Sequence, residues 1–101
     1  MASSVIKNSG IYRGRVNYSY SMGANGNANT NLKTLIDANV PSGYECIGIC
    51  GYATNSVYVQ VCNCYYSDSP YSLQLSNRAN STQAETCAIF YLAMPMQILA
   101  E

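Results

Sequence analysis

The sequence predicts an all-β fold: an antiparallel β-sandwich, jelly-roll-like in form, with about six to eight strands. Apolar segments recur at a spacing of roughly 8–12 residues, and turn-forming residues separate them. Most of these segments alternate apolar with polar side chains, as strands with one face in water do. The length of 101 residues fits a single domain. We expect the sandwich to cover residues 11–94, with an N-terminal extension in residues 1–10 and a C-terminal tail in residues 95–101.

The first long strand is expected over residues 11–22, where polar side chains alternate with those of Tyr12, Val16, Tyr18, Tyr20 and Met22. Residues 23–31 are rich in Asn and Gly, a composition typical of a surface loop. In residues 32–36 the apolar positions fit the spacing of a helix and also the alternation of a strand. The all-β surroundings favour a short strand there. A turn is predicted next, in residues 40–43, by the sequence Val-Pro-Ser-Gly.

A β-hairpin is expected over residues 44–66, and the rest of the chain is organised around it. Thr54, Asn55 and Ser56 lie between two alternating segments, and Asn tolerates the left-handed backbone of a tight turn. With a period of two, one face of the hairpin carries Ile47, Ile49, Val57, Val59 and Val61. The other face, named the Tyr/Cys face, carries Tyr44, Cys46, Cys50, Tyr52, Tyr58, Cys62, Cys64 and Tyr66. Gly48 and Gly51, inside the first segment, favour β-bulges or close approach of another backbone.

The Tyr/Cys face is too apolar to be an ordinary solvated surface. Exposed together, its side chains would exceed the roughly 300–600 Å² that is typical of the largest apolar patch on a monomer. Charged residues make up only 10% of the chain, and five basic residues balance five acidic ones, so little repulsion opposes association. These features predict a homo-oligomer that assembles through the Tyr/Cys face, and a trimer is the state that we expect. Alternatively, a second sheet of the same chain covers this face.

Two further strands are expected after the hairpin. Residues 71–77 place Tyr71, Leu73 and Leu75 on an inner face. Residues 83–94 carry apolar side chains on both faces, with Cys87, Ile89 and Tyr91 on one and Ala88, Phe90, Leu92 and Met94 on the other. This strand is therefore expected to be central and covered on both sides. Pro95 ends it.

Composition narrows the classes of function. The chain has no histidine, the residue that most often supplies acid–base chemistry near neutral pH, and its carboxylates show no paired spacing. We therefore do not expect an enzyme. Its five basic residues form no dense patch, which argues against binding of nucleic acid. No segment approaches the ~18 apolar residues of a membrane span, and the first residues lack a signal-peptide run, so membrane insertion is not expected.

Five cysteines, an odd number, fit buried free thiols better than a secreted disulfide framework. A cross-strand disulfide is the alternative. It would join Cys46 to Cys64 in one register of the hairpin, and Cys50 to Cys62 in a register shifted by two. Cys62 and Cys64 lie along one strand instead of in the tight Cys-x-x-Cys turn of many zinc sites. We expect no metal and no cofactor.

Four motifs of turn and strand carry a resemblance to a known family. They are Val40-Pro-Ser-Gly-Tyr, Gly51-Tyr52-Ala53-Thr54-Asn55, Tyr71-Ser-Leu-Gln-Leu-Ser-Asn77 and the apolar strand ending in Tyr91-Leu92. Over residues 12–94 the chain resembles the C-terminal tip domains of tail-fibre and receptor-binding proteins from phages and prophages of Gram-positive gut bacteria. The resemblance implies a homotrimeric β-sandwich tip that binds a bacterial surface glycan or protein. It also implies synthesis in the bacterial cytoplasm and a final place on the virion tail, outside the cell.

Other functions remain open beside this one: a structural assembly subunit of a phage particle, or a small secreted lectin-like or inhibitor domain. Tyrosines near the hairpin and its loop can stack on sugar rings or fill subunit interfaces, because each ring has an apolar body and a polar tip. Core packing is the alternative role for any one of them. The candidate ligand or interface residues are Tyr44, Tyr52, Asn55, Tyr58, Tyr65, Tyr66, Asp68 and Tyr71.

Overall fold

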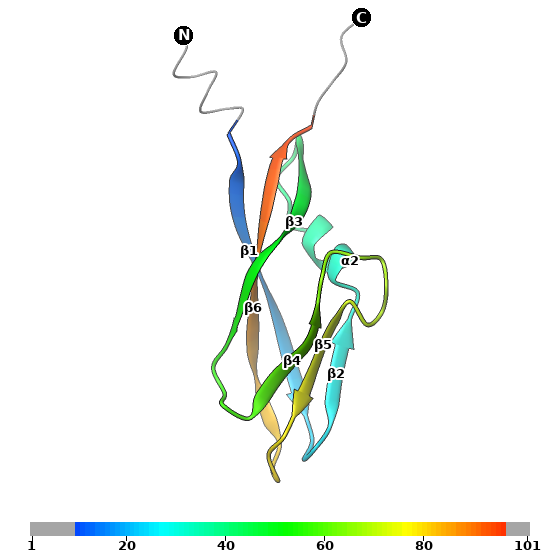
Figure 1. The fold of residues 1–101 in the computed structure, drawn as a ribbon, viewed down its shortest axis with the longest axis vertical. Helices are drawn as coiled ribbons and strands as arrows, with labels where there is room; N and C mark the ends of the chain where they lie inside the picture. Colours follow the sequence, from blue (N-terminus) through cyan, green and yellow to red (C-terminus); the bar gives the residue numbers. More distant parts are fainter. Residues whose placement is uncertain (1–9, 97–101) are drawn as a thin grey trace, which may run out of the picture.

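The computed structural model describes residues 10–96, and within them the chain forms six strands and one short helix (Figure 1). The elements are β1 (Tyr12–Met22), β2 (Asn27–Thr30), α2 (Leu32–Asp37), β3 (Tyr44–Thr54), β4 (Val59–Cys64), β5 (Leu73–Asn77) and β6 (Gln83–Pro95). The predicted strands at residues 11–22, 71–77 and 83–94 are confirmed. Most of the predicted N-terminal extension and C-terminal tail, residues 1–9 and 97–101, lies outside the described residues.

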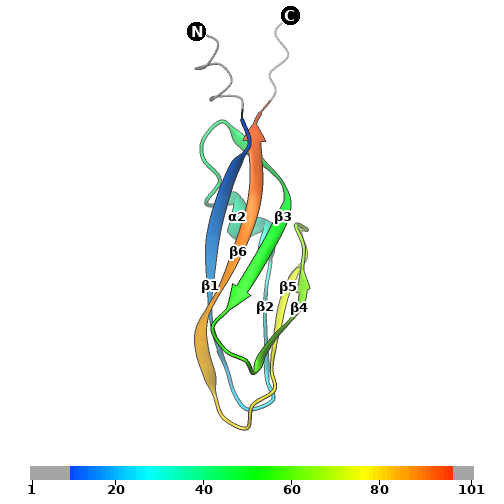
Figure 2. The same cartoon turned by 60° about the vertical axis from the view of Figure 1, so that its left-hand side comes forward.

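The strands form two antiparallel sheets of three strands each, in the orders β1-β6-β3 and β2-β5-β4 (Figures 1 and 2). The predicted all-β sandwich is confirmed. β1 pairs with β6, and β2 pairs with β5. This pairing of early strands with late ones is typical of a jelly roll, which here has six strands. Because β1 and β6 are antiparallel neighbours, β1 starts and β6 ends at the same end of the sandwich.

The predicted hairpin of residues 44–66 is wrong, because β3 and β4 belong to different sheets. β3 pairs with β6, and β4 pairs with β5, so the connection between β3 and β4 crosses from one sheet to the other. A turn at Ser56, whose carbonyl accepts from the Val59 amide at 3.3 Å, redirects the chain. Val57 lies in this crossing and is 94% exposed, so it contributes nothing to the apolar face predicted for it.

Bulges in β3 change which of its side chains face the core. The register shifts between Cys46 and Gly48 and between Ile49 and Gly51, which confirms the bulges predicted from the two glycines. Each bulge adds one residue to β3, so the period of two is broken twice. Ile49 packs against the core, whereas Ile47 is 47% exposed. The two isoleucines, predicted to share a face, therefore do not.

The Tyr/Cys face is consequently not one surface. Half of its residues pack against the core from opposite sheets, namely Tyr44 and Cys46 on β3 and Cys64 and Tyr66 at the end of β4 or just after it. The other half, Cys50, Tyr52, Tyr58 and Cys62, are exposed. The surface proposed for assembly of a trimer is thus wrong, and the number of copies in an oligomer stays a prediction.

A helix, α2, replaces the strand predicted at residues 32–36. Asn31 caps it, because its side-chain oxygen accepts from the Thr34 amide at 3.0 Å. Leu32 and Ile36 are fully buried on one side of the helix, as their helical spacing allows. The predicted loop at residues 23–31 also contains a short strand, β2, which pairs with β5.

Strand β6 is central in its sheet, as predicted, but it is not covered on both faces. Its inner side chains, Cys87, Ile89, Tyr91 and Ala93, are at most 1% exposed and lie in the core between the two sheets. The outer side chains of Phe90 and Leu92 are only partly buried, and Met94 is 39% exposed. No element among residues 10–96 packs over these outer side chains as a second layer (Figure 2).

Candidate functional site: a pocket beside helix α2

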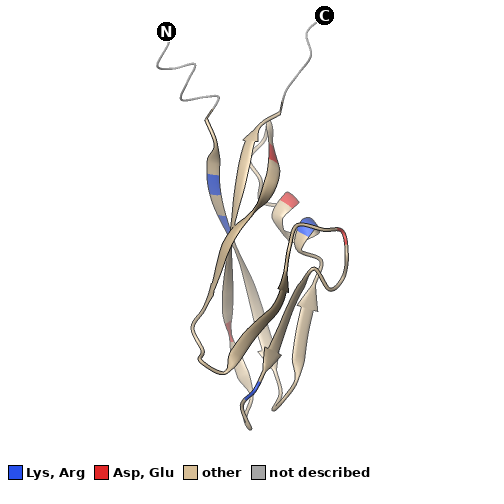
Figure 3. Cartoon of the chain, viewed as in Figure 1, with Lys and Arg blue, Asp and Glu red and all other residues tan. Residues whose placement is uncertain are grey.

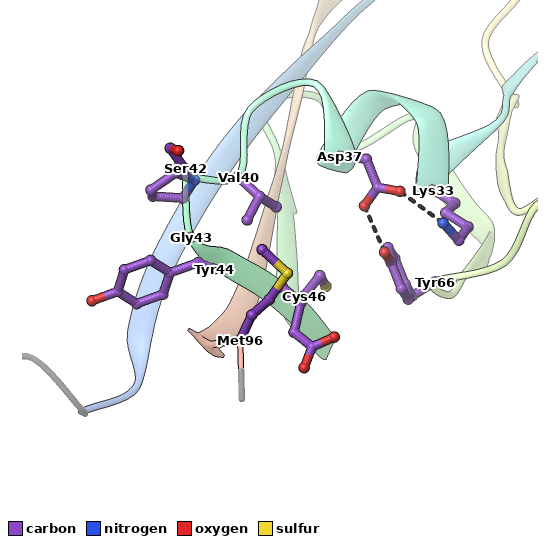
Figure 4. Close-up of a pocket in the computed structure, with 11 residues that line it drawn as sticks. Lys33, Asp37, Val40, Ser42, Gly43, Tyr44, Cys46, Tyr66 and Met96 are labelled. Carbon is purple, nitrogen blue, oxygen red and sulfur yellow. Dashed lines mark hydrogen bonds and ion pairs between the residues drawn. The ribbon is translucent and has the colours of Figure 1, made fainter. Parts of the chain in front are cut away.

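An open pocket of about 450 Å³ lies between α2, the turn that follows it and the first residues of β3 (Figure 4). Lys33, Asp37 and Tyr66 form one side, and Val40, Ser42 and Tyr44 form the other. Between them lie Met96, just after β6, and Cys46. The pocket therefore has a hydrogen-bonded polar group on one side, and the rest of its lining mixes apolar side chains with polar ones, Glu45 among them.

The turn at residues 40–43 sets the shape of the pocket. The Tyr44 amide donates to the Pro41 carbonyl at 3.0 Å, and Gly43 takes a φ of +83°, a left-handed conformation that glycine adopts without strain. The Met96 amide donates to the Gly43 carbonyl at 2.8 Å, which ties the end of β6 to the turn. Tyr44 is held at the rim by an edge-to-face contact with Tyr12, with ring centroids 5.9 Å apart.

Three side chains on the polar side form one hydrogen-bonded group. Lys33 Nζ lies 2.7 Å from Asp37 Oδ2, and the Tyr66 hydroxyl donates to Asp37 Oδ1 at 2.5 Å. Lys33 Nζ also lies 5.3 Å from the centre of the Tyr66 ring, within the range of a cation–π contact. Lys33 and Asp37 are one helical turn apart, so α2 brings them together.

The group fixes the protonation states of its members at neutral pH. Burial, the largest effect on Asp37, acts to raise its pKa, but the hydrogen bonds from Lys33 and Tyr66 and the charge of Lys33 together lower it. Burial and the bond to Asp37 raise the pKa of Tyr66 to about 12. The pocket therefore presents the ionised carboxylate of Asp37, the neutral phenol of Tyr66 and the ammonium group of Lys33. The ammonium group has three N–H donors, more than its bond to Asp37 uses.

Cysteine chemistry is weak at this site. Burial raises the pKa of the Cys46 thiol, so the thiolate that acts as nucleophile or metal ligand is disfavoured. All five cysteines are free, as the odd number of cysteines predicted. Cys46 and Cys64 lie in different sheets, so the alternative, a disulfide across a hairpin ladder, is wrong. Among residues 10–96, no three His, Cys, Asp or Glu side chains are placed to hold a metal ion together.

The eight predicted site residues fall into three groups. Tyr44 and Tyr66 line the pocket. Tyr52, Asn55 and Tyr58 lie at the other end of β3, in or beside the crossing to β4, and are exposed. Tyr65, Asp68 and Tyr71 lie in the loop from β4 to β5, where Asp68 accepts from the Asn31 side-chain amide at 2.6 Å. The structure thus brings together only Tyr44 and Tyr66, and the eight predicted residues do not form one surface.

Sequence reasoning missed Lys33, Asp37 and Met96 as members of a site. The signal for the first two was present, because Lys33 and Asp37 are four residues apart and face each other only if the segment is helical. Interpreted as a strand, the same segment would place them about 13 Å apart, at ~3.3 Å per residue. Met96 gave no signal, because its place in the pocket depends on the pairing of β6 with β3.

Known proteins do not identify this site. Comparisons of the chain with models of protein families, with curated proteins and with solved structures found no match. The resemblance to phage tail-fibre tips stays a prediction from the sequence motifs. Within residues 10–96 the structure has no helix of the length and hydropathy that a membrane span needs.

Proposed function

We propose that the domain is a non-enzymatic recognition module that binds a hydroxyl-rich ligand, a glycan of a bacterial surface, in the pocket beside α2. The observation that carries the proposal is the Lys33–Asp37–Tyr66 group, which forms one side of an open pocket that Tyr44 also lines. The resemblance to tail-fibre tips supports the same class of ligand. In that setting the protein is made in a bacterial cytoplasm and acts outside the cell, on a virion tail.

The chemistry of the pocket matches that of a sugar. Sugar hydroxyls donate and accept hydrogen bonds, and the pocket offers acceptor lone pairs on Asp37 and donors on Lys33. A sugar ring also has an apolar face, which packs against aromatic side chains such as Tyr44. The side chains are already hydrogen-bonded to one another, so binding requires little further ordering of them.

Binding assays with matched variants test the proposal. The protein is applied to an array of bacterial glycans, and the affinity for the best ligand is then measured for Asp37→Asn and Tyr44→Ala. Hydrogen bonds to charged groups contribute about 1.5–3 kcal/mol, so we expect Asp37→Asn to weaken binding about tenfold to a hundredfold. Tyr52→Ala, which removes an exposed tyrosine at the other end of β3, is the control and should bind normally.

Two outcomes would contradict the pocket as the binding site. One is the absence of binding to any glycan or bacterial surface. The other is loss of binding in Tyr52→Ala with full binding in the two pocket variants. Circular dichroism of each variant establishes that the fold is unchanged.

A second candidate function is that of a structural subunit in a larger assembly. The observation that favours it is the outer face of the β1-β6-β3 sheet, where apolar side chains of β6 and β3 are exposed. Co-purification with particle components, together with no binding to glycans, would favour this function over the first.

A further inference from the structure

The outer face of the β1-β6-β3 sheet is the face turned away from the other sheet, and it is apolar along its middle. The central strand places Phe90, Leu92 and Met94 there. The bulges of β3 add two more side chains, because Ile47 with Gly48 opposes Leu92, and Cys50 with Gly51 opposes Phe90. Ile47, Cys50 and Met94 are all exposed. These five side chains are called the apolar stripe.

Charges of opposite sign flank the apolar stripe. Arg13 and Arg15 on β1 pair in register with Leu92 and Phe90, and their guanidinium carbons lie 6.0 and 5.7 Å from the centre of the Phe90 ring. Glu45 on β3 pairs in register with Met94, so it lies on the same face. Figure 3 shows the two basic positions on β1 and the acidic one on β3 toward the same end of the sheet.

These three charges have no ionic partner within the described part of the chain. Among residues 10–96 the one ion pair is Lys33–Asp37, which lies in the pocket. Arg15 donates to the Asn17 side chain at 2.9 Å, a bond that leaves its charge unpaired. The face therefore has basic groups on one edge, an acidic group on the other and an apolar centre, an arrangement that is complementary to itself.

We propose that the outer face is a self-association surface, at which two copies of the chain pack face to face about a two-fold axis parallel to β6. This rotation lays β6 of one copy against β6 of the other, and it places β1 of each copy opposite β3 of the other. The two apolar stripes then cover each other, as the inner faces of a sandwich do. Arg13 of each copy meets Glu45 of the other copy.

The spacing along the strands fits these contacts. Arg13 is level with Leu92, and Glu45 is level with Met94, two residues farther along β6. At ~3.3 Å per residue the offset is about 7 Å, which an extended arginine side chain spans. A second copy fits better than nucleic acid, because Glu45 would repel phosphate. A two-fold axis is favoured over a three-fold axis, because three of the five side chains of the apolar stripe lie on the central strand, so the middle of the face is apolar.

Charge reversal tests the proposal. Arg13→Glu alone and Glu45→Arg alone each bring two like charges into contact at two symmetric places. The affinity of each variant for a second copy should therefore be at least about tenfold lower than that of the unmodified protein. An equimolar mixture of the two should associate again, because every contact then joins opposite charges. Sedimentation at rising concentration measures the mass, and the unmodified protein should approach that of two chains.

Matched controls separate the contact from overall charge. Arg78→Glu reverses an exposed arginine at the end of β5, outside the apolar stripe, and should associate normally. Its mixture with Glu45→Arg has the same net charges as the mixture above but leaves one repulsive contact, so it should associate more weakly. The proposal is overturned if the unmodified protein stays monomeric or forms trimers at high concentration. It is overturned equally if both single reversals associate normally, or if the complementary mixture does not recover association.

Discussion

The two faces of β6 carry side chains of similar hydrophobicity, yet residues 10–96 cover only one of them. On the inner face, Ile89 and Tyr91 are almost completely buried between the sheets. On the outer face, Leu92 is partly exposed and Met94 more so. The sequence of an apolar strand does not show which of its two faces is buried. The packing of the other strands determines this. We propose that a second copy of the chain covers the other side.

The largest difference between the two faces is expected on truncation of their side chains. Ile89→Ala creates a cavity in the core and should reduce the free energy of unfolding by about 2–5 kcal/mol. Met94→Ala removes a side chain that is already 39% exposed, so the free energy of unfolding should change by no more than about 0.5 kcal/mol in dilute protein. Chemical denaturation followed by circular dichroism measures both values. Equal losses in the two variants would show that the outer face is also core.

Glycines on the two faces give a second comparison. A Cβ on Gly14, on the inner face, would overlap the Tyr91 ring, which is held by a hydrogen bond from its hydroxyl to the Asn39 carbonyl at 3.3 Å. Gly14→Ala should therefore cost about 1–3 kcal/mol. A Cβ on Gly51 would have its nearest neighbour, the Phe90 ring, at 3.9 Å, an ordinary contact.

Gly51→Ala is accordingly expected to leave stability within about 0.5 kcal/mol of the unmodified protein. Thermal unfolding of the two variants, side by side, measures the difference. A Gly51→Ala protein destabilised as much as Gly14→Ala would mean that another part of the chain covers the bulge.

The smallest expected effect on stability concerns Tyr66 in the pocket, which is polar and partly exposed to solvent, unlike the core. The pKa of Tyr66 is raised to about 12 in the folded protein, against ~10 in the unfolded chain. A raised pKa means that the stabilising contribution is complete below about pH 10 and is lost as the pH rises toward 12. The stability difference between the unmodified protein and Tyr66→Phe should thus be constant from pH 7 to 9 and shrink above pH 10. A difference that grows above pH 10 would contradict the bond to Asp37.

Much of the fold can be predicted from local sequence. The alternation in Tyr12–Met22 and the apolar Gln83–Pro95 segment identify the two long strands, and Gly48 and Gly51 indicate the bulges. What local sequence does not contain is the partner of each strand. β3 pairs with the distant strand β6 instead of with its neighbour β4, and the inner side chains of β6 lie in the core.

Less of the candidate site can be predicted, because it depends on that long-range pairing. The chemistry of Tyr44 and Tyr66 predicts both as site residues, and both line the pocket. Lys33 and Asp37 are not predicted, because they face each other only in a helix, whereas the apolar spacing of residues 32–36 also fits a strand. Aromatic chemistry is visible in a sequence, whereas the meeting of segments distant in sequence, such as α2 and Met96, is not.

The most direct measurement of the difference between the two faces of the sandwich uses two native thiols. Cys50 lies in the apolar stripe, and Cys62 lies on β4 in the other sheet; both are exposed. Alkylation followed by mass spectrometry gives the labelling rate of each at rising protein concentration. If the outer face of the β1-β6-β3 sheet is covered by a second copy, labelling of Cys50 slows with concentration while labelling of Cys62 does not. Equal relative rates at every concentration would contradict the account.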